Sequence, residues 1–167
     1  MNSKVTNNVI RFILLVLAQV LICNNINFMG YINPYIYILF ILLFPVKDSR
    51  LQVIFLSFLI GTTIDMFSDS GGVHAAASVV IAYARPLFLK FSFGTLYEYQ
   101  TIKFSHTDLG NLTIYVATMT LLHHLVLFSL EIFNISNILQ ILQQTLFSGI
   151  FTLIICVLLI VLFGRRK

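Results

Sequence analysis

Charged residues are scarce in this sequence, and their scarcity excludes a soluble globular domain. Only 10% of the 167 residues are Asp, Glu, Lys or Arg, whereas 59% are hydrophobic and the mean hydropathy is +0.96. A soluble domain carries about a quarter charged residues. We therefore expect an integral membrane protein. Because apolar segments take up nearly all of the chain, we expect a single membrane domain over residues 1–167.

Cysteine is also scarce, and the common catalytic motifs are missing. Cys23 and Cys156 each lie in or beside an apolar run, where a thiol behaves as a small hydrophobic group, so we expect no disulfide framework. The sequence contains no His-Glu-x-x-His, no Gly-x-Ser-x-Gly and no P-loop. No nucleophile has a recognisable base. We therefore expect neither an enzyme nor a cofactor.

Six apolar segments are separated by polar breaks. A bilayer core of about 30 Å is crossed by roughly 20 apolar residues in a helix. No small-residue cleavage site follows the first segment, so we expect it to be an uncleaved span. The longest polar connection is residues 91–111. The sequence predicts an all-α membrane protein, a compact bundle of six transmembrane helices at about 8–24, 31–46, 51–67, 72–90, 112–132 and 138–163.

All Lys and Arg residues fall on one side of this predicted topology. With six spans both termini share that side, and the other side carries only Asp65, Asp69 and Glu131. The positive-inside rule therefore predicts cytoplasmic N- and C-termini. Basic residues that flank spans set topology, so their excess does not indicate nucleic-acid binding, and a basic tail can contact anionic lipids. The basic residues are Lys4, Arg11, Lys47, Arg50, Arg85, Lys90, Lys103, Arg165, Arg166 and Lys167.

A polar hairpin lies between the third and fourth apolar segments. It contains Asp65, Asp69, Gly71, Gly72 and His74. An ionisable group at the mouth of a span is costly, so this hairpin is the first candidate for function. Asp65 either caps the following helix, since helix N-termini favour anions, or the hairpin contacts a partner. Two carboxylates and one histidine indicate a metal only weakly, and we expect none.

Small residues follow the hairpin at helical spacing. Ala75, Ser78 and Ala82 fall on one helical face, and Arg85 continues it. Small side chains let a neighbouring helix approach closely in a membrane. This face is therefore expected either to pack within the bundle or to dock a membrane helix of a partner.

The fifth apolar segment contains three further ionisable residues. His123 and His124 are adjacent and point to different faces of a helix, so they cannot chelate one ion together. His124 and Glu131 are seven residues apart and share a face. We expect all three to make buried polar contacts within the bundle rather than to act in catalysis.

Several of these residues together resemble a known family. Phe44-Pro45, Arg50, Gly61-x-x-x-Asp65-x-x-Ser68 and Gly71-Gly72-x-His74-Ala75-Ala76-Ala77 resemble the MreD family of bacterial rod shape-determining membrane proteins. The match covers about residues 44–90, and His123-His124 with Glu131 resembles one branch of the family. Length, six spans and inward termini agree with it. The exit from the second segment, Pro-Val-Lys-Asp-Ser-Arg, leaves open whether Lys47 or Arg50 is the usual basic residue.

The resemblance implies a scaffold or regulator of cell elongation and side-wall peptidoglycan synthesis in the bacterial inner membrane. It implies MreC as direct partner, and an indirect link to MreB, to RodA and to its class B penicillin-binding transpeptidase. The alternative is the substrate-binding subunit of a vitamin-type importer, because MreD-like chains are similar in fold to those subunits. Such subunits usually carry an Ala-x-x-x-Ala docking face on their first helix, whereas the first segment here has one alanine, Ala18. We therefore prefer the scaffold.

Overall fold

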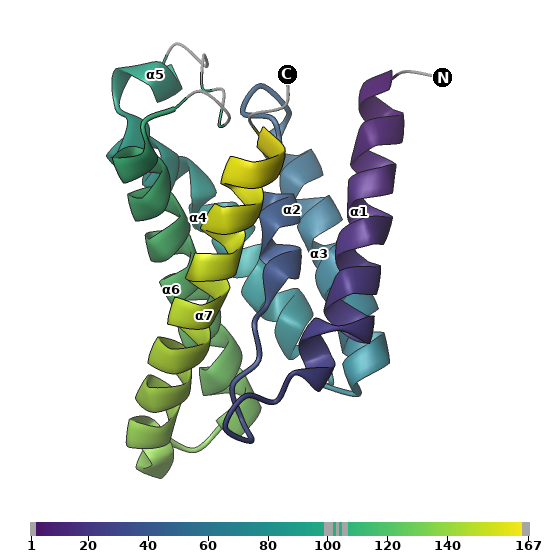
Figure 1. Ribbon diagram of the computed structural model, residues 1–167, viewed down its shortest axis with the longest axis vertical. Helices are drawn as coiled ribbons and strands as arrows, with labels where there is room; N and C mark the ends of the chain where they lie inside the picture. Colours follow the sequence, from purple (N-terminus) through teal and green to yellow (C-terminus); the bar gives the residue numbers. More distant parts are fainter. Residues whose placement is uncertain (1–2, 99–101, 103, 105–106, 165–167) are drawn as a thin grey trace.

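The computed structural model describes residues 3–98, 102, 104 and 107–164 (Figure 1). Within this part of the chain every regular element is helical, apart from an isolated antiparallel bridge between Phe28 and Ile32. The long helices are α1 (Ser3–Leu21), α3 (Arg50–Ser68), α4 (Val73–Phe93), α6 (Leu109–Ile132) and α7 (Ile138–Gly164). The short elements are η1 (Cys23–Asn25), η2 (Ile36–Ile38), α2 (Leu39–Leu42), α5 (Thr95–Glu98) and η3 (Ile135–Asn137).

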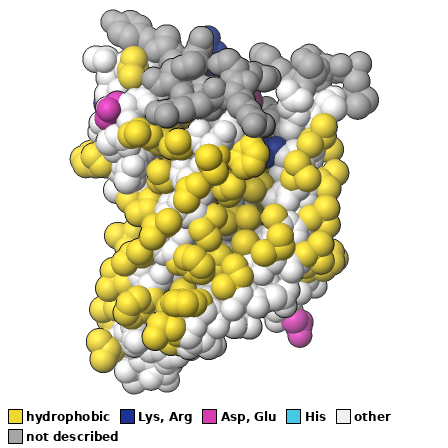
Figure 2. Space-filling view, viewed as in Figure 1, with side chains coloured by type: hydrophobic (Ala, Val, Ile, Leu, Met, Phe, Trp, Pro, Cys, Tyr) yellow, Lys and Arg dark blue, Asp and Glu magenta, His cyan; other side chains and the backbone are white. Residues whose placement is uncertain are grey.

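In the part of the chain that the structure describes, five helices are long and apolar enough to cross a membrane. They correspond to the expected first, third, fourth, fifth and sixth segments, and their candidate spans are Val5–Asn25, Arg50–Ser68, Val73–Phe93, Leu109–Ile132 and Ile138–Phe163. Figure 2 shows hydrophobic side chains over the middle of the visible face, with few charges, near its ends. Side chains that face lipid must be apolar. The chain is accordingly a multi-pass, all-α membrane protein.

The prediction of a helix over 31–46 is wrong. The chain is irregular up to Tyr35 and then forms only η2 and the four-residue α2. Tyr35 has a non-helical backbone (φ −111°, ψ 73°), and Pro34 before it has no amide hydrogen with which to continue a helix. The apolar run is therefore long enough for a span, but its local sequence does not support a continuous helix.

This short segment nevertheless forms the centre of the bundle. Every residue from Ile36 to Leu42 is buried, and η2 and α2 together contact α1, α3, α4 and α7 (Figure 1). Phe44 is also buried, at 1% exposed. The segment therefore supplies the hydrophobic core around which the long helices pack.

Helices α3 and α4 approach each other closely at Gly61. A Cβ atom added at Gly61 would lie 2.5 Å from the Cα atom of Ala75, which is closer than two such atoms can come. Ala75, Ser78, Ala82 and Arg85, the expected small-residue face, are all buried. Of the two alternatives for this face, the structure therefore shows packing within the bundle.

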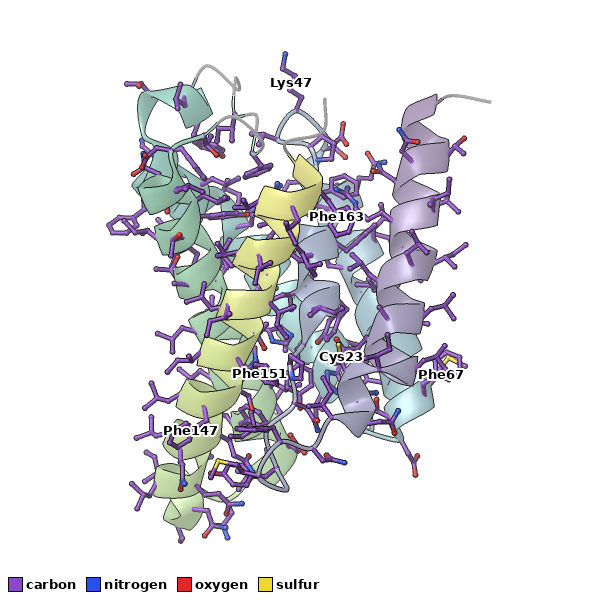
Figure 3. All side chains as sticks on the ribbon, viewed as in Figure 1. Cys23, Lys47, Phe67, Phe147, Phe151 and Phe163 are labelled. Atoms are coloured by element: carbon purple, nitrogen blue, oxygen red, sulfur yellow. The ribbon has the colours of Figure 1, made fainter. Side chains whose placement is uncertain are left out.

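The two ends of the bundle carry different charges. The start of α1 and the end of α7 lie at one end (Figure 1), and the labelled Lys47 lies there too, whereas Phe67 and Cys23 lie towards the opposite end (Figure 3).

The expected 91–111 connection is partly helical, because α4 continues to Phe93 and α5 follows. Lys103, Arg165, Arg166 and Lys167 lie outside the described residues. Cys23 and Cys156 are buried free thiols.

The close approach at Gly61 can be tested by substitution. We expect Gly61→Ala to lower the unfolding temperature of the detergent-purified protein, because the added Cβ forces two backbones apart at a cost of about 1–3 kcal/mol. Gly149→Ala is the matched control, since no atom outside its own helix surroundings lies within 4 Å of the added Cβ. Equal thermal stability of the two variants would contradict the close packing of α3 on α4.

Candidate functional site

The Asp65 carboxylate joins the end of α3 to the start of α4. Its Oδ1 accepts from the main-chain N–H of His74 at 3.0 Å, and its Oδ2 accepts from that of Ala75 at 2.8 Å. The Ser70 hydroxyl donates to Oδ1 at 2.6 Å. Asp65 is only 7% exposed, and it accepts from two main-chain N–H groups in the first turn of α4. It therefore caps this helix. Removing this carboxylate would therefore disturb the hairpin itself as well as any partner contact.

The tip of the hairpin is shaped by residues with positive φ. Asp69 ends α3 in the left-handed region at φ 51°, and its N–H donates to the Asp65 carbonyl oxygen. Gly71 and Gly72 follow at φ 67° and 97°, where a side chain would be strained. Asp69 is exposed and caps nothing with its side chain among the described contacts. Asp65 is thus structural, whereas Asp69 is free to meet a partner.

Tyr37, in the central segment (residues 31–46), forms hydrogen bonds with two of the predicted histidines, His74 and His123. The Tyr37 hydroxyl lies 3.1 Å from His74 Nδ1 and 2.7 Å from His123 Nε2. Tyr37 and His123 are both 0% exposed. One hydroxyl carries one hydrogen, so Tyr37 donates to one ring and accepts from the other.

The remaining nitrogen of His123 indicates which group donates in each of the two Tyr37 hydrogen bonds. His123 Nδ1 is buried and has no hydrogen-bond partner among the described residues. A buried N–H without a partner is rarer than a buried lone pair without one. We therefore assign the hydrogen of His123 to Nε2, which donates to Tyr37, and Tyr37 in turn donates to His74 Nδ1.

His124 forms a second, separate set of contacts. Its Nδ1 lies 2.8 Å from the Thr120 carbonyl oxygen, which can only accept, so Nδ1 carries the hydrogen. Its Nε2 then accepts from the Thr152 hydroxyl at 3.1 Å, and that oxygen accepts from the Tyr35 N–H at 3.0 Å. His124 therefore joins α6 to α7 and to the segment before η2.

The prediction that Glu131 makes a buried polar contact within the bundle is wrong. Glu131 is exposed rather than buried, because it lies in the last turn of α6. It lines a cavity of about 280 Å³ at the hairpin end of the bundle. His74 lies on the wall of the same cavity, as do Tyr35 and Ser70. The cavity is lined with polar groups and opens near the tip of the hairpin.

Two arginines hold the other end of the central segment. Arg85, 5% exposed, donates from Nη2 to the carbonyl oxygens of Leu42, at 3.3 Å, and Phe44. Arg11 Nη1 donates to the carbonyl oxygen of Leu43 at 3.3 Å. Cations near the C-terminal end of a helix are favourable, because the last carbonyl groups lack helical partners. Arg85 therefore has a structural contact that its place on the small-residue face did not predict.

Sequence reasoning missed two further residues that hold this segment, Tyr115 and Gln19. Tyr115 donates its hydroxyl to the Leu42 carbonyl oxygen at 3.1 Å and accepts from Arg85 Nε at 3.2 Å. Gln19, 0% exposed, donates to the Pro34 carbonyl oxygen at 3.0 Å and accepts from the Tyr37 N–H at 3.3 Å. The available signal was a polar residue inside an apolar segment, as with Arg11 and Gln19.

The chemistry available to these centres is limited. Their hydrogen bonds are made largely by neutral side chains and main-chain groups, and they fix the positions of helices. Among the described residues, no group of three or more His, Cys, Asp or Glu side chains is arranged to hold a metal ion.

Replacing Tyr37 tests the hydrogen-bonded centre. We expect Tyr37→Phe to destabilise the purified protein by about 1–3 kcal/mol, because two buried imidazole nitrogens lose their partner. Tyr35→Phe is the matched control, since the Tyr35 contacts that we describe are made by its ring and its N–H. Thermal unfolding measures both, and equal loss in the two variants would refute a specific role of the Tyr37 hydroxyl.

No family model, curated protein or solved structure matches this chain. Its function is therefore inferred from its own residues and contacts.

Proposed function

We propose that this chain is a non-enzymatic scaffold of the bacterial cell-elongation complex, acting with MreC in the control of cell shape and side-wall peptidoglycan synthesis. Through MreC it would be linked to MreB, to RodA and to the class B penicillin-binding transpeptidase. The chain would lie in the bacterial inner membrane.

One observation supports this proposal above the others: the residues that resemble the MreD pattern also connect the elements of the bundle. The Phe44 carbonyl oxygen accepts from Arg85, Arg50 Nη2 donates to the Tyr83 carbonyl oxygen at 2.9 Å, and Gly61 packs on Ala75. Asp65 caps α4, and the Ser68 hydroxyl accepts from Asn24 Nδ2 at 3.0 Å. Six members of the pattern, Phe44, Arg50, Gly61, Asp65, Ser68 and Ala75, thus make contacts between elements, and this supports the proposal.

The proposed topology has six crossings and cytoplasmic termini. The central segment, residues 31–46, supplies the sixth crossing without a continuous helix. The charge distribution supports the orientation. Lys47 lies at the end of the bundle where α1 begins (Figure 3), Arg50 begins α3, and Lys90 is in the last turn of α4. Asp65 and Asp69 are instead at the end of α3, and Glu131 is in the last turn of α6. By the positive-inside rule the basic end is cytoplasmic.

The hairpin tip is the proposed contact with the periplasmic domain of MreC. Met66 and Phe67 are 80% and 64% exposed next to the exposed Asp69. Both lie in the last turn of α3, at the outer end of its candidate span, beside the charged tip. Such a patch at the outer end is accessible to a partner that projects into the periplasm.

An importer subunit is the second candidate, and the cavity near Glu131 is the observation that favours it. Its walls include Tyr35, His74 and Glu131, which could orient a small polar molecule. At about 280 Å³, however, it is smaller than the pockets of about 300–1,000 Å³ that hold drug-sized ligands such as a vitamin. The scaffold remains the better supported function.

Co-purification tests the proposal. From cells that express the chain with a C-terminal tag, mild detergent should recover an MreC-like protein and wall synthases. Asp69→Asn, which is tolerated at positive φ, should reduce recovery of the MreC-like protein several-fold and increase cell width, with unchanged thermal stability.

Glu131→Gln is the charge-matched control at the same end of the bundle, and it should leave recovery of the MreC-like protein unchanged. An equal effect of the two variants would assign the loss to net charge and remove the hairpin tip from the proposal. Recovery of an ATPase and its membrane coupler without wall proteins would contradict the scaffold and support the importer.

A further inference from the structure

A second cavity lies at the basic end of the bundle, away from the hairpin. It has a volume of about 240 Å³ and is enclosed by the turn between α2 and α3, by α4 and by Tyr97 of α5. Three charged residues line it: Asp48 from the turn, Arg50 from the start of α3 and Arg85 from α4. The remaining wall is apolar, including Ala82 and Leu89. Charged groups of both signs thus face one small space at a membrane boundary.

The guanidinium groups of Arg50 and Arg85 are held by contacts within the protein, but some of their N–H groups make no hydrogen bond to a described residue. Arg85 makes its hydrogen bonds through Nε and Nη2, which leaves Nη1 without a hydrogen bond to any described residue. The Arg50 guanidinium lies over the Tyr83 ring, 4.2 Å from its centroid, while Nη2 donates to the Tyr83 carbonyl oxygen. Each guanidinium therefore keeps N–H groups that make no hydrogen bond to a described residue, and both side chains line the cavity.

The combination of charges selects a class of ligand. Arginine is well suited to phosphate, because its planar group offers several N–H donors to one anion. A simple anion would satisfy the two arginines but would be repelled by Asp48. A ligand that carries both a phosphate and an amine satisfies all three residues. The volume suits such a group, since it is below that of most sites for larger ligands.

We propose that this cavity binds a phosphoethanolamine group, with its phosphate on Arg50 and Arg85 and its amine on Asp48. The group comes either from the headgroup of a bilayer phospholipid or from a soluble phosphomonoester of the same chemistry. This site does not depend on the scaffold function, and failure of either proposal leaves the other in place.

Ligand-dependent stability tests the site on the full-length chain. The delipidated protein in detergent is titrated with short-chain phosphatidylethanolamine, phosphatidylglycerol and phosphatidylcholine, and with soluble phosphoethanolamine. The shift in unfolding temperature is measured against the ligand-free form of each variant, because a ligand that binds the folded state stabilises it. We expect phosphatidylethanolamine to act at a concentration about tenfold lower than the other two lipids. A soluble ligand that acts equally well identifies a soluble source, whereas an effect of the lipid alone identifies the bilayer.

Three variants make the test specific to the cavity. Arg50→Gln should weaken phosphatidylethanolamine binding about tenfold, through loss of a charge-assisted contact. Asp48→Asn should remove the preference over phosphatidylglycerol. Lys47→Gln, a neighbouring exposed cation that does not line the cavity, should bind as the wild type does. Equal binding of the three lipids by the wild type, wild-type binding by Arg50→Gln, or an equal loss in Lys47→Gln would overturn the proposal.

Discussion

The structure depends on satisfying the main-chain polar groups of a short segment that lies inside a membrane bundle. A four-residue helix such as α2 leaves most of its N–H and C=O groups without helical partners, and lipid offers none. Side chains of the long helices supply them instead: Gln19 and Thr152 at the start of the segment, and Arg11, Arg85 and Tyr115 at its end. These five polar residues of the long helices are therefore explained by the segment that lies between the helices.

The same arrangement separates two regions with different tasks. Towards the hairpin end, Asp65 and the Tyr37–histidine contacts join the helices and leave Asp69 exposed at the tip. Towards the basic end, Arg85 holds the central segment and also faces a cavity. A rigid interior with a distinct surface at each end fits a protein that positions others, because neither surface needs the core to rearrange.

Hydropathy alone predicted five of the long helices within a few residues, since length and apolar character determine a span. It failed for residues 31–46, because an apolar run has the same composition whether it forms a spanning helix or an irregular buried segment. Helical spacing placed Ala75 and Ser78 on one face correctly. It could not show that Tyr37 lies between His74 and His123, because that contact joins positions up to 86 residues apart. The exposure of Glu131 depends on where α6 ends, which is among the least certain features of a sequence.

The central segment is tested most directly by hydrogen–deuterium exchange over residues 36–44, comparing the wild type with Tyr115→Phe. Slow exchange of these amides in the wild type, and faster exchange in the variant while α7 stays protected, is the predicted result, because Tyr115 donates to the Leu42 carbonyl oxygen. Exchange in the wild type as fast as in an exposed loop would contradict a buried central segment. Acceleration spread equally over all helices would contradict its local support by Tyr115.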